Sequence, residues 1–162
     1  MPTVEIKGLD RLKRHLETLG KDVDKIVDNS LHKSAYQINR QAIKNIQNMN
    51  VSYNGRIYDA KETGRLMRSI TVEKLAMCQY AVGTAVKYAA AVEFGTGSAG
   101  DPVVPHTTRV KWTYYDPAKG QYRTAYPAPP RPFLRPAFDK EAQKRVVEAL
   151  ARDMMREARG GM

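Results

Sequence analysis

Apolar residues recur at helical spacing in three parts of the chain. Near the start, a narrow stripe ends at Gly20, a residue typical of helix C-caps, and comprises Leu9, Leu12, Leu16 and Leu19. A longer helix begins near Asp22, and its apolar face comprises Val23, Val27, Leu31, Ala35, Ile38, Ala42 and Ile46. A last helix is predicted from about Pro132 to Arg159, with Pro136 in its first turn and a stripe of Phe138, Ala142, Val146, Leu150 and Met154.

Alternation of apolar and polar residues predicts short strands between these helices. Val4 and Ile6 alternate in the opening TVEIK, and Ile70 and Val72 follow a helical turn for which Thr63 is a suitable N-cap. The segment QYAVGTAV is read as a further strand, with small residues on one side and Tyr80, Val82 and Val86 on the other. The stretch from Asn48 to Glu62 lacks a stable period and contains Asn-Gly, so it is interpreted as a loop.

A hairpin is predicted at about residues 106–126, followed by a proline-rich strap at residues 127–136. DPAKG supplies turn residues between two alternating stretches, the first of which carries Val110, Trp112 and Tyr114 on one side and Arg109, Lys111 and Thr113 on the other. We expect one aromatic face, which includes Tyr122, and one basic face. A lone hairpin is marginal in water, so we expect it to project and to pack on another chain; the alternative is a hairpin folded back on its own sheet.

These elements predict a single α+β domain over residues 1–162. Its expected core is a small antiparallel or mixed sheet packed by the long N-terminal helix and the C-terminal helix. No apolar run is long enough to span a membrane, and the start MPTVEIKG lacks the apolar centre of a signal peptide, so a soluble protein made in a cytoplasm is expected.

Charge adds a preference for anionic partners. The chain has 27 Lys and Arg against 17 Asp and Glu, a net charge of +10. Half of this excess lies between Val103 and Pro136, where Asp116 is the one acidic residue. This favours nucleic acid or an acidic protein as a partner, with candidate contacts at Arg109, Lys111, Lys119 and Arg123.

The sequence signals for catalysis or cofactor binding are weak. Gly95, Gly97 and Gly100 match the dinucleotide fingerprint G-x-G-x-x-G, but they follow KYAAAVEF, which is read as a short helix that Gly95 or Gly97 ends. Asp101-Pro102 then prevents the helix that a pyrophosphate needs, so a glycine-rich connection is the stronger reading.

The other reactive residue types also lack a site pattern. His15, His32 and His106 have no metal-ligand spacing, and Cys78, the one cysteine, is interpreted as a structural thiol. Glu93 is expected to make a salt bridge or a helix-end contact rather than a catalytic pair with Asp101. We therefore expect that the protein is not an enzyme and binds no cofactor and no metal.

Four motifs, in order, carry a resemblance to a known family. GLDRLKRHLETL, TGRLMRSITV, YAAAVEFGTG and RPFLRPAF together resemble the tail-completion, or head-to-tail joining, proteins of long-tailed double-stranded DNA phages. The resemblance implies a non-enzymatic virion protein, assembled in the host cytoplasm, that forms a hexameric ring in the neck. It implies as partners further copies of the chain, the head connector or stopper protein and the tail tube or tail terminator protein. Double-stranded DNA in the lumen is a further candidate partner.

The contacts of such a ring can be assigned to particular residues as a hypothesis. The expected oligomer or partner contacts are Tyr88, Val92, Phe94, Val110, Trp112, Tyr114, Tyr122, Phe133 and Leu134. Two rival functions remain open, a basic nucleic-acid-binding module, for which aromatic and basic residues together are suited, and a small nucleotide-dependent enzyme, which is the weaker of the two.

Overall fold

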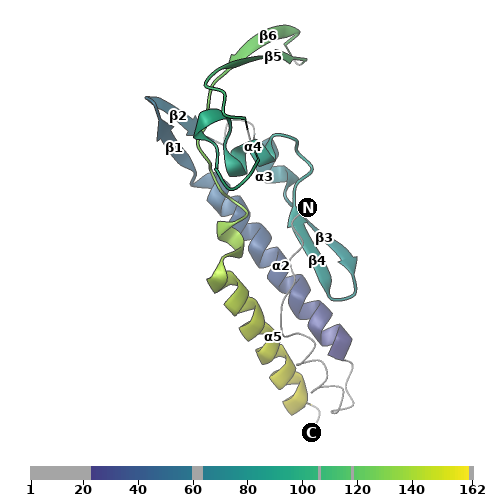
Figure 1. The fold of residues 1–162 in the computed structure, drawn as a ribbon. Helices are drawn as coiled ribbons and strands as arrows, with labels where there is room; N and C mark the ends of the chain where they lie inside the picture. Colours follow the sequence, from purple (N-terminus) through teal and green to yellow (C-terminus); the bar gives the residue numbers. More distant parts are fainter. Residues whose placement is uncertain (1–22, 60–63, 106, 118, 161–162) are drawn as a thin grey trace.

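The computed structural model describes residues 23–59, 64–105, 107–117 and 119–160. Two long helices, α2 (Val23–Gln47) and α5 (Lys140–Gly160), lie side by side and run in opposite directions (Figure 1). Between them in the sequence come three hairpins and the short helices α3 (Arg65–Ser69) and α4 (Ala89–Phe94). The predicted α+β class is confirmed. The predicted first strand, the leucine stripe before Gly20, His15 and His106 fall outside the described residues.

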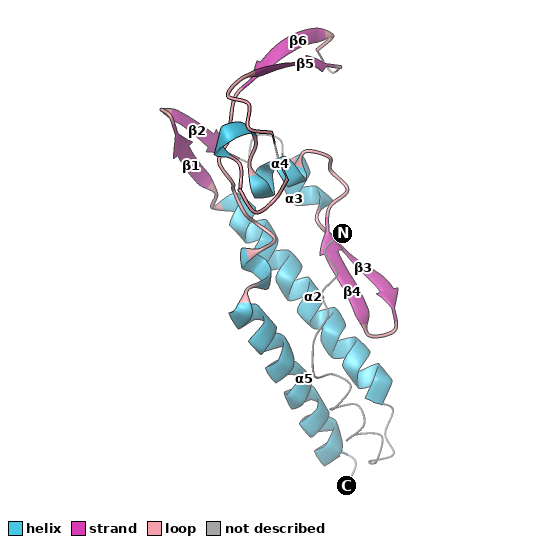
Figure 2. Ribbon diagram, viewed as in Figure 1, coloured by secondary structure: helices cyan, strands magenta, loops and turns pink. Residues whose placement is uncertain are grey.

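The strands form three separate antiparallel hairpins in the described part of the chain, rather than one sheet (Figure 2). They are β1 (Asn50–Tyr53) with β2 (Arg56–Asp59), β3 (Thr71–Ala76) with β4 (Gln79–Gly83), and β5 (Trp112–Asp116) with β6 (Gln121–Ala125). β3 and β4 lie along α2. The other two hairpins lie at the end of the molecule that is opposite to the start of α2 and the end of α5 (Figure 1). Val86 was expected in a strand but lies beyond the end of β4, where the Thr84 hydroxyl accepts its backbone N–H at 3.1 Å.

The loop predicted from Asn48 to Glu62 is wrong over residues 50–59, which form the β1–β2 hairpin. Asn54 and Gly55 both have positive φ, 49° and 71°, the combination that a two-residue type I′ turn requires. Val51 pairs with Tyr58 and Tyr53 with Arg56. The Asn-Gly dipeptide therefore marks a hairpin turn rather than an irregular loop.

Two clusters of apolar side chains make up the core. One lies between the lower halves of α2 and α5 and comprises Val23, Val27, Leu31, Val146, Leu150 and Met154. The other joins the end of α2 to α3, α4 and the chain before α5, and comprises Ala42, Ile46, Met49, Leu66, Ile70, Ala89, Val92, Phe133 and Ala137. The apolar stripes predicted on the two long helices are thus buried, apart from Ile38 and Phe138, which are half-buried.

The starts of two helices differ from the sequence prediction. Gly64, with φ of 55°, precedes α3 in the position expected for Thr63, which lies outside the described residues. The last helix does not run unbroken from Pro132, because Pro136–Phe138 form a separate 3-10 turn, η3, and Asp139 is extended. The Asp139 carboxylate accepts the backbone N–H of Ala142 at 2.8 Å, so it caps a new helix, α5, whose first residue is Lys140.

Candidate assembly surface

The β5–β6 hairpin and its flanks, residues 109–126, form an arm at one end of the molecule. The ribbon of β5 and β6 stands apart from the paired helices (Figure 1), and most of its side chains are exposed. Tyr122 is 76% exposed, Tyr115 53% and Tyr114 44%, although all three are aromatic. These side chains do not contribute to either core cluster, so the arm presents aromatic surface outward.

The register of the arm corrects the expected division into one aromatic and one basic face. Residues directly opposite in an antiparallel pair point to the same side, and Tyr114 lies opposite Arg123 while Tyr115 lies opposite Tyr122. One face therefore carries Trp112, Tyr114, Asp116, Gln121 and Arg123, and the other carries Thr113, Tyr115, Tyr122 and Thr124. Tyr122 is on the second face, not with Trp112 and Tyr114, so both faces are aromatic.

The cations of the arm fall into two groups. Arg123 forms an ion pair with Asp116 on the Trp112 face, with Arg123 Nη1 3.4 Å from Asp116 Oδ2. Arg109 and Lys111 precede β5, and Lys119 lies in the turn between β5 and β6. These three residues are exposed. Charge is therefore concentrated at the two ends of the ribbon.

Glycines at the base of the arm allow two backbone segments to meet. Thr96 and Ala128 exchange two backbone hydrogen bonds of 2.8 and 3.1 Å, forming an isolated bridge beside Gly95. A Cβ on Gly95 would lie 2.6 Å from the Ala128 oxygen, and a Cβ on Gly97 would lie 2.6 Å from the Arg109 oxygen. Gly95 and Gly97 of the apparent dinucleotide fingerprint therefore serve close backbone packing, and Gly95 ends α4, as the connection reading predicts.

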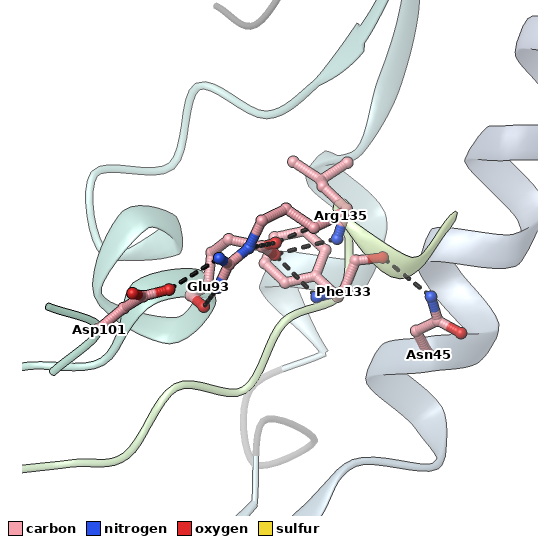
Figure 3. A network of polar contacts seen from close by, with 6 residues as sticks. Asn45, Glu93, Asp101, Phe133 and Arg135 are labelled. Atoms are coloured by element: carbon pink, nitrogen blue, oxygen red, sulfur yellow. Dashed lines mark hydrogen bonds and ion pairs between the residues drawn. The ribbon is translucent and has the colours of Figure 1, made fainter. Parts of the chain in front are cut away.

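Below this bridge, Glu93 at the end of α4 holds the chain that leads into α5 (Figure 3). The Glu93 side chain is buried, and its Oε2 accepts the backbone N–H of Phe133 at 2.7 Å and that of Leu134 at 2.9 Å. Its Oε1 accepts the backbone N–H of Arg135 at 3.0 Å. One carboxylate thus satisfies three successive backbone donors just before η3.

Arg135 extends this contact to a second carboxylate. Its Nε lies 3.3 Å from Glu93 Oε1, and its Nη1 donates to Asp101 Oδ2 at 2.7 Å. The hydrogen bond to Asp101 and the one to Glu93 raise the pKa of Arg135 further above its already high ordinary value. We call Glu93, Asp101, Phe133, Leu134 and Arg135 the joint. The salt-bridge and helix-end contacts expected of Glu93 are confirmed.

The joint is also fixed to α2. The Asn45 side chain donates to the backbone oxygen of Phe133 at 2.9 Å, and the Phe133 ring is fully buried in the core cluster that α2 lines (Figure 3). The part of the proline strap that lies between the arm and the joint is held as well, because Arg131 N donates to the Val92 oxygen at 2.8 Å. The arm therefore projects from a firmly attached base.

The β1–β2 hairpin supports the junction of the arm and the strap. The Tyr58 hydroxyl donates to the Pro127 oxygen at 3.0 Å, and the Arg56 guanidinium lies 4.1 Å from the centre of the Tyr126 ring. Sequence reasoning missed this support because residues 48–62 were interpreted as a loop. The Asn-Gly turn signal at residues 54–55 could have identified it.

The residues proposed as partner contacts are placed in three different settings. Val92 and Phe133 are buried in the chain's own core, and Leu134 and Phe94 are half-buried, with the Arg135 guanidinium 4.8 Å from the Phe94 ring centre. Tyr88 is 38% exposed at the start of α4. Val110, Tyr114 and Tyr122 are exposed on the arm, whereas Trp112 at its base is half-buried beside Gly97.

A second polar cluster fixes the β3–β4 turn to α2. The Asp28 carboxylate accepts Lys74 Nζ at 2.5 Å, the backbone N–H of Cys78 at 2.9 Å and the Tyr80 hydroxyl at 3.1 Å. Hydrogen bonds from Lys74 and Cys78 lower the pKa of Asp28. Cys78 adopts a positive φ of 59°, and its half-buried thiol lies in this turn, as a structural role requires.

The described residues contain neither a candidate metal site nor a candidate membrane-spanning helix. Within them, no group of three or more His, Cys, Asp or Glu side chains is placed to hold a metal ion. His32 on α2 instead packs its ring edge-on to Tyr36 at 4.8 Å. Of the helices in the described segments, none is long and apolar enough to cross a membrane.

Comparison with known proteins identifies a family. A family model described as "Bacteriophage HK97-gp10, putative tail-component" matches residues 10–95. This range runs from the first leucine stripe through α2, the first two hairpins and α4 to Gly95. No curated protein and no solved structure matches the chain.

Proposed function

Because the chain belongs to the HK97-gp10-like family of phage tail components, whose model covers more than half of it, we propose that it is a structural neck protein without catalytic activity. In this proposal, copies of the chain close into a hexameric ring between the head connector and the tail. The ring joins the DNA-filled head to the tail tube or tail terminator protein. The order of the four motifs along the chain supports this placement within the tail family.

The observation that carries the proposal is the projecting arm. An isolated two-stranded hairpin is marginally stable in water, yet here both faces of the ribbon carry exposed aromatic side chains. A neighbouring molecule that covers Trp112 and Tyr114 supplies the missing apolar contact. The base held by the joint orients the arm before such contact forms, which reduces the ordering cost of association.

A ring of identical subunits also needs a second surface that receives the arm. In a heterologous contact, one patch of each subunit meets a different patch of the next, and a ring forms where the rotation between neighbours closes. Away from the arm, exposed apolar side chains occur at the β3–β4 turn, Leu75 and Met77, and on α5, Val147 and Met155. The β3–β4 turn is the more firmly held of these patches, because Asp28 fixes it to α2.

The test is removal of the arm. Residues 108–126 are replaced with a short Gly-Ser linker, and the product is examined for cooperative unfolding, for ring formation by mass photometry and electron microscopy, and for joining of isolated heads to tails. The proposal expects a monomer that folds but fails to join heads to tails. A wild-type protein that stays monomeric alone and with tail tubes, and is absent from virions, contradicts the proposal.

Single substitutions on and off the arm separate the effect of the arm from that of any change in exposed apolar surface. Tyr114→Ala removes an exposed aromatic ring from the Trp112 face, and Val103→Ala removes apolar surface from a residue that is 85% exposed outside the arm. We expect Tyr114→Ala to weaken ring formation and Val103→Ala to leave it unchanged. If arm deletion instead abolishes cooperative unfolding of the monomer, the hairpin belongs to the subunit's own core.

A further inference from the structure

The arm carries a positive charge that its own residues leave uncompensated. Among the described residues of the arm, Asp116 is the single acidic side chain, and it is paired with Arg123. Arg109, Lys111 and Lys119 remain, all exposed and without an ion pair to the described residues. Like charges held on one ribbon repel one another, so this arrangement is most favourable when a polyanion lies against it.

The charges are placed at the ends of a hydroxyl-bearing surface. Arg109 and Lys111 precede β5 and Lys119 lies in the turn, so they bracket strands of five residues, a length of roughly 17 Å. Between them, one face carries Thr113, Tyr115, Tyr122 and Thr124, each with a hydroxyl that can donate to a phosphate oxygen. The acidic Asp116 lies on the opposite face.

We propose that this face of the arm binds double-stranded DNA through its sugar-phosphate backbone. The major groove of B-DNA, about 12 Å wide, admits a two-stranded β-ribbon. A ribbon longer than this width reaches the phosphates that border the groove with the cations at its base and tip. Threonine and tyrosine hydroxyls on phosphates position a protein without reading base sequence, so binding is independent of sequence.

Two features favour duplex DNA over other polyanions or a protein. Tyr115 and Tyr122 pack edge to face with ring centres 5.4 Å apart, so each has less free ring surface on which an unpaired base could stack. A second copy of the chain also carries the same excess of positive charge, +10.

The inference rests on the proposed function for the place where DNA is met, because a neck ring surrounds the path of DNA into the tail. It assigns the two faces of the arm to different partners. The Trp112 and Tyr114 face contacts the next subunit, and the Tyr115 and Tyr122 face looks toward the duplex. The excess of positive charge belongs to the single chain, so DNA binding by the arm can be tested without a ring.

The experiment measures binding of the full-length protein to a short mixed-sequence DNA duplex by fluorescence anisotropy, between about 50 and 200 mM NaCl. One variant combines Arg109→Gln, Lys111→Gln and Lys119→Gln on the arm. Its matched control combines Lys144→Gln, Arg145→Gln and Arg152→Gln, three exposed cations of α5. Both variants lose the same charge from the chain.

The expected result is a smaller salt dependence for the arm variant alone. Each phosphate contact contributes about 0.9 to the slope of log affinity against log salt, so loss of the three arm cations should lower it by about 2 to 3. The α5 variant should keep the wild-type slope. An equal fall in both variants, an absence of wild-type binding at about 50 mM NaCl, or tighter binding to a single strand of the same sequence overturns the inference.

Ring formation and head-to-tail joining by the same preparations separate this inference from the proposed function. An arm variant that keeps wild-type affinity for DNA but fails to join heads to tails shows that the cations contact protein, which overturns the inference and leaves the neck role intact. A wild-type monomer that forms no ring, yet binds duplex DNA through the arm cations, supports the inference and contradicts the neck ring.

Discussion

The backbone amide of Phe133 donates to the buried carboxylate of Glu93 across 2.7 Å, although 40 positions separate the two residues. Leu134 and Arg135 donate to the same carboxylate, so the end of α4 and the start of the C-terminal segment are joined by one side chain (Figure 3). The motifs VEFG and RPFLRP therefore meet in space. The stability of the joint gives the first prediction.

Glu93→Gln should lower the free energy of unfolding by about 2 to 4 kcal/mol, because an amide cannot accept from all three backbone donors and carries no charge. Urea denaturation measures the change. Glu73→Gln, on the exposed face of β3, is the matched control and should change stability little. Equal effects of the two substitutions would mean that the joint contributes nothing specific.

Gly95→Ala should destabilise the protein more than Gly55→Ala. Both glycines have positive φ, 73° and 71°, but Gly95 combines it with a ψ of −175°, a region essentially restricted to glycine, so Gly95→Ala imposes the larger backbone strain. A Cβ at residue 95 also meets the Ala128 oxygen at 2.6 Å, whereas one at residue 55 meets nothing within 4 Å. Thermal unfolding of the two variants measures the difference; similar midpoints would show that the strap is free to move away from Gly95.

Phe133→Ala should cost about 3 to 5 kcal/mol, the range for loss of a fully buried aromatic ring. Leu134→Ala should cost less because Leu134 is half-buried, and the double variant should fail to fold or to assemble. Denaturation and ring formation are both measured. Unchanged melting and unchanged assembly of the double variant would rule out an anchoring role for this pair.

Acid should weaken the attachment of the β3–β4 turn. The pKa of Asp28 is lowered in the folded chain by the Lys74 and Cys78 hydrogen bonds, so its contribution is complete above the ordinary Asp pKa and is lost as pH falls through the folded value. Asp28→Asn should therefore be less stable than the wild type near neutral pH, and the difference should shrink below about pH 4. A difference that stays constant with pH would assign the effect to packing rather than to charge.

The two long helices could be predicted because buried apolar residues recur at helical spacing within each of them. The stripe from Val23 to Ile46 marks the side of α2 that faces the core, and the positions from Ala142 to Met154 do the same for α5. Local turn chemistry was less certain, because Asn54-Gly55 fits both an irregular loop and a hairpin turn. Only pairing of the flanking residues distinguishes the two.

The arm could be predicted as a hairpin, but not which side chains share a face. Alternation fixes the sides of each strand separately, whereas the turn decides how the two strands are aligned. Here Asp116 pairs with Gln121, which places Tyr122 opposite Tyr115 rather than beside Tyr114. The joint could not be predicted, because the sequence indicates the type of partner that Glu93 needs but not which distant backbone segment supplies it.

The bridge between Thr96 and Ala128 affects how a force on the arm is transmitted to the rest of the molecule. The chain leaves the arm just before Ala128, which exchanges two hydrogen bonds with Thr96 on the segment after α4, so the base of the arm is attached to that segment. The load passes to the Arg131–Val92 hydrogen bond and then to Glu93, which shares it among several bonds beside α2. A force on the arm is therefore passed to α4 and α2 through the hydrogen bonds at its base and in the joint.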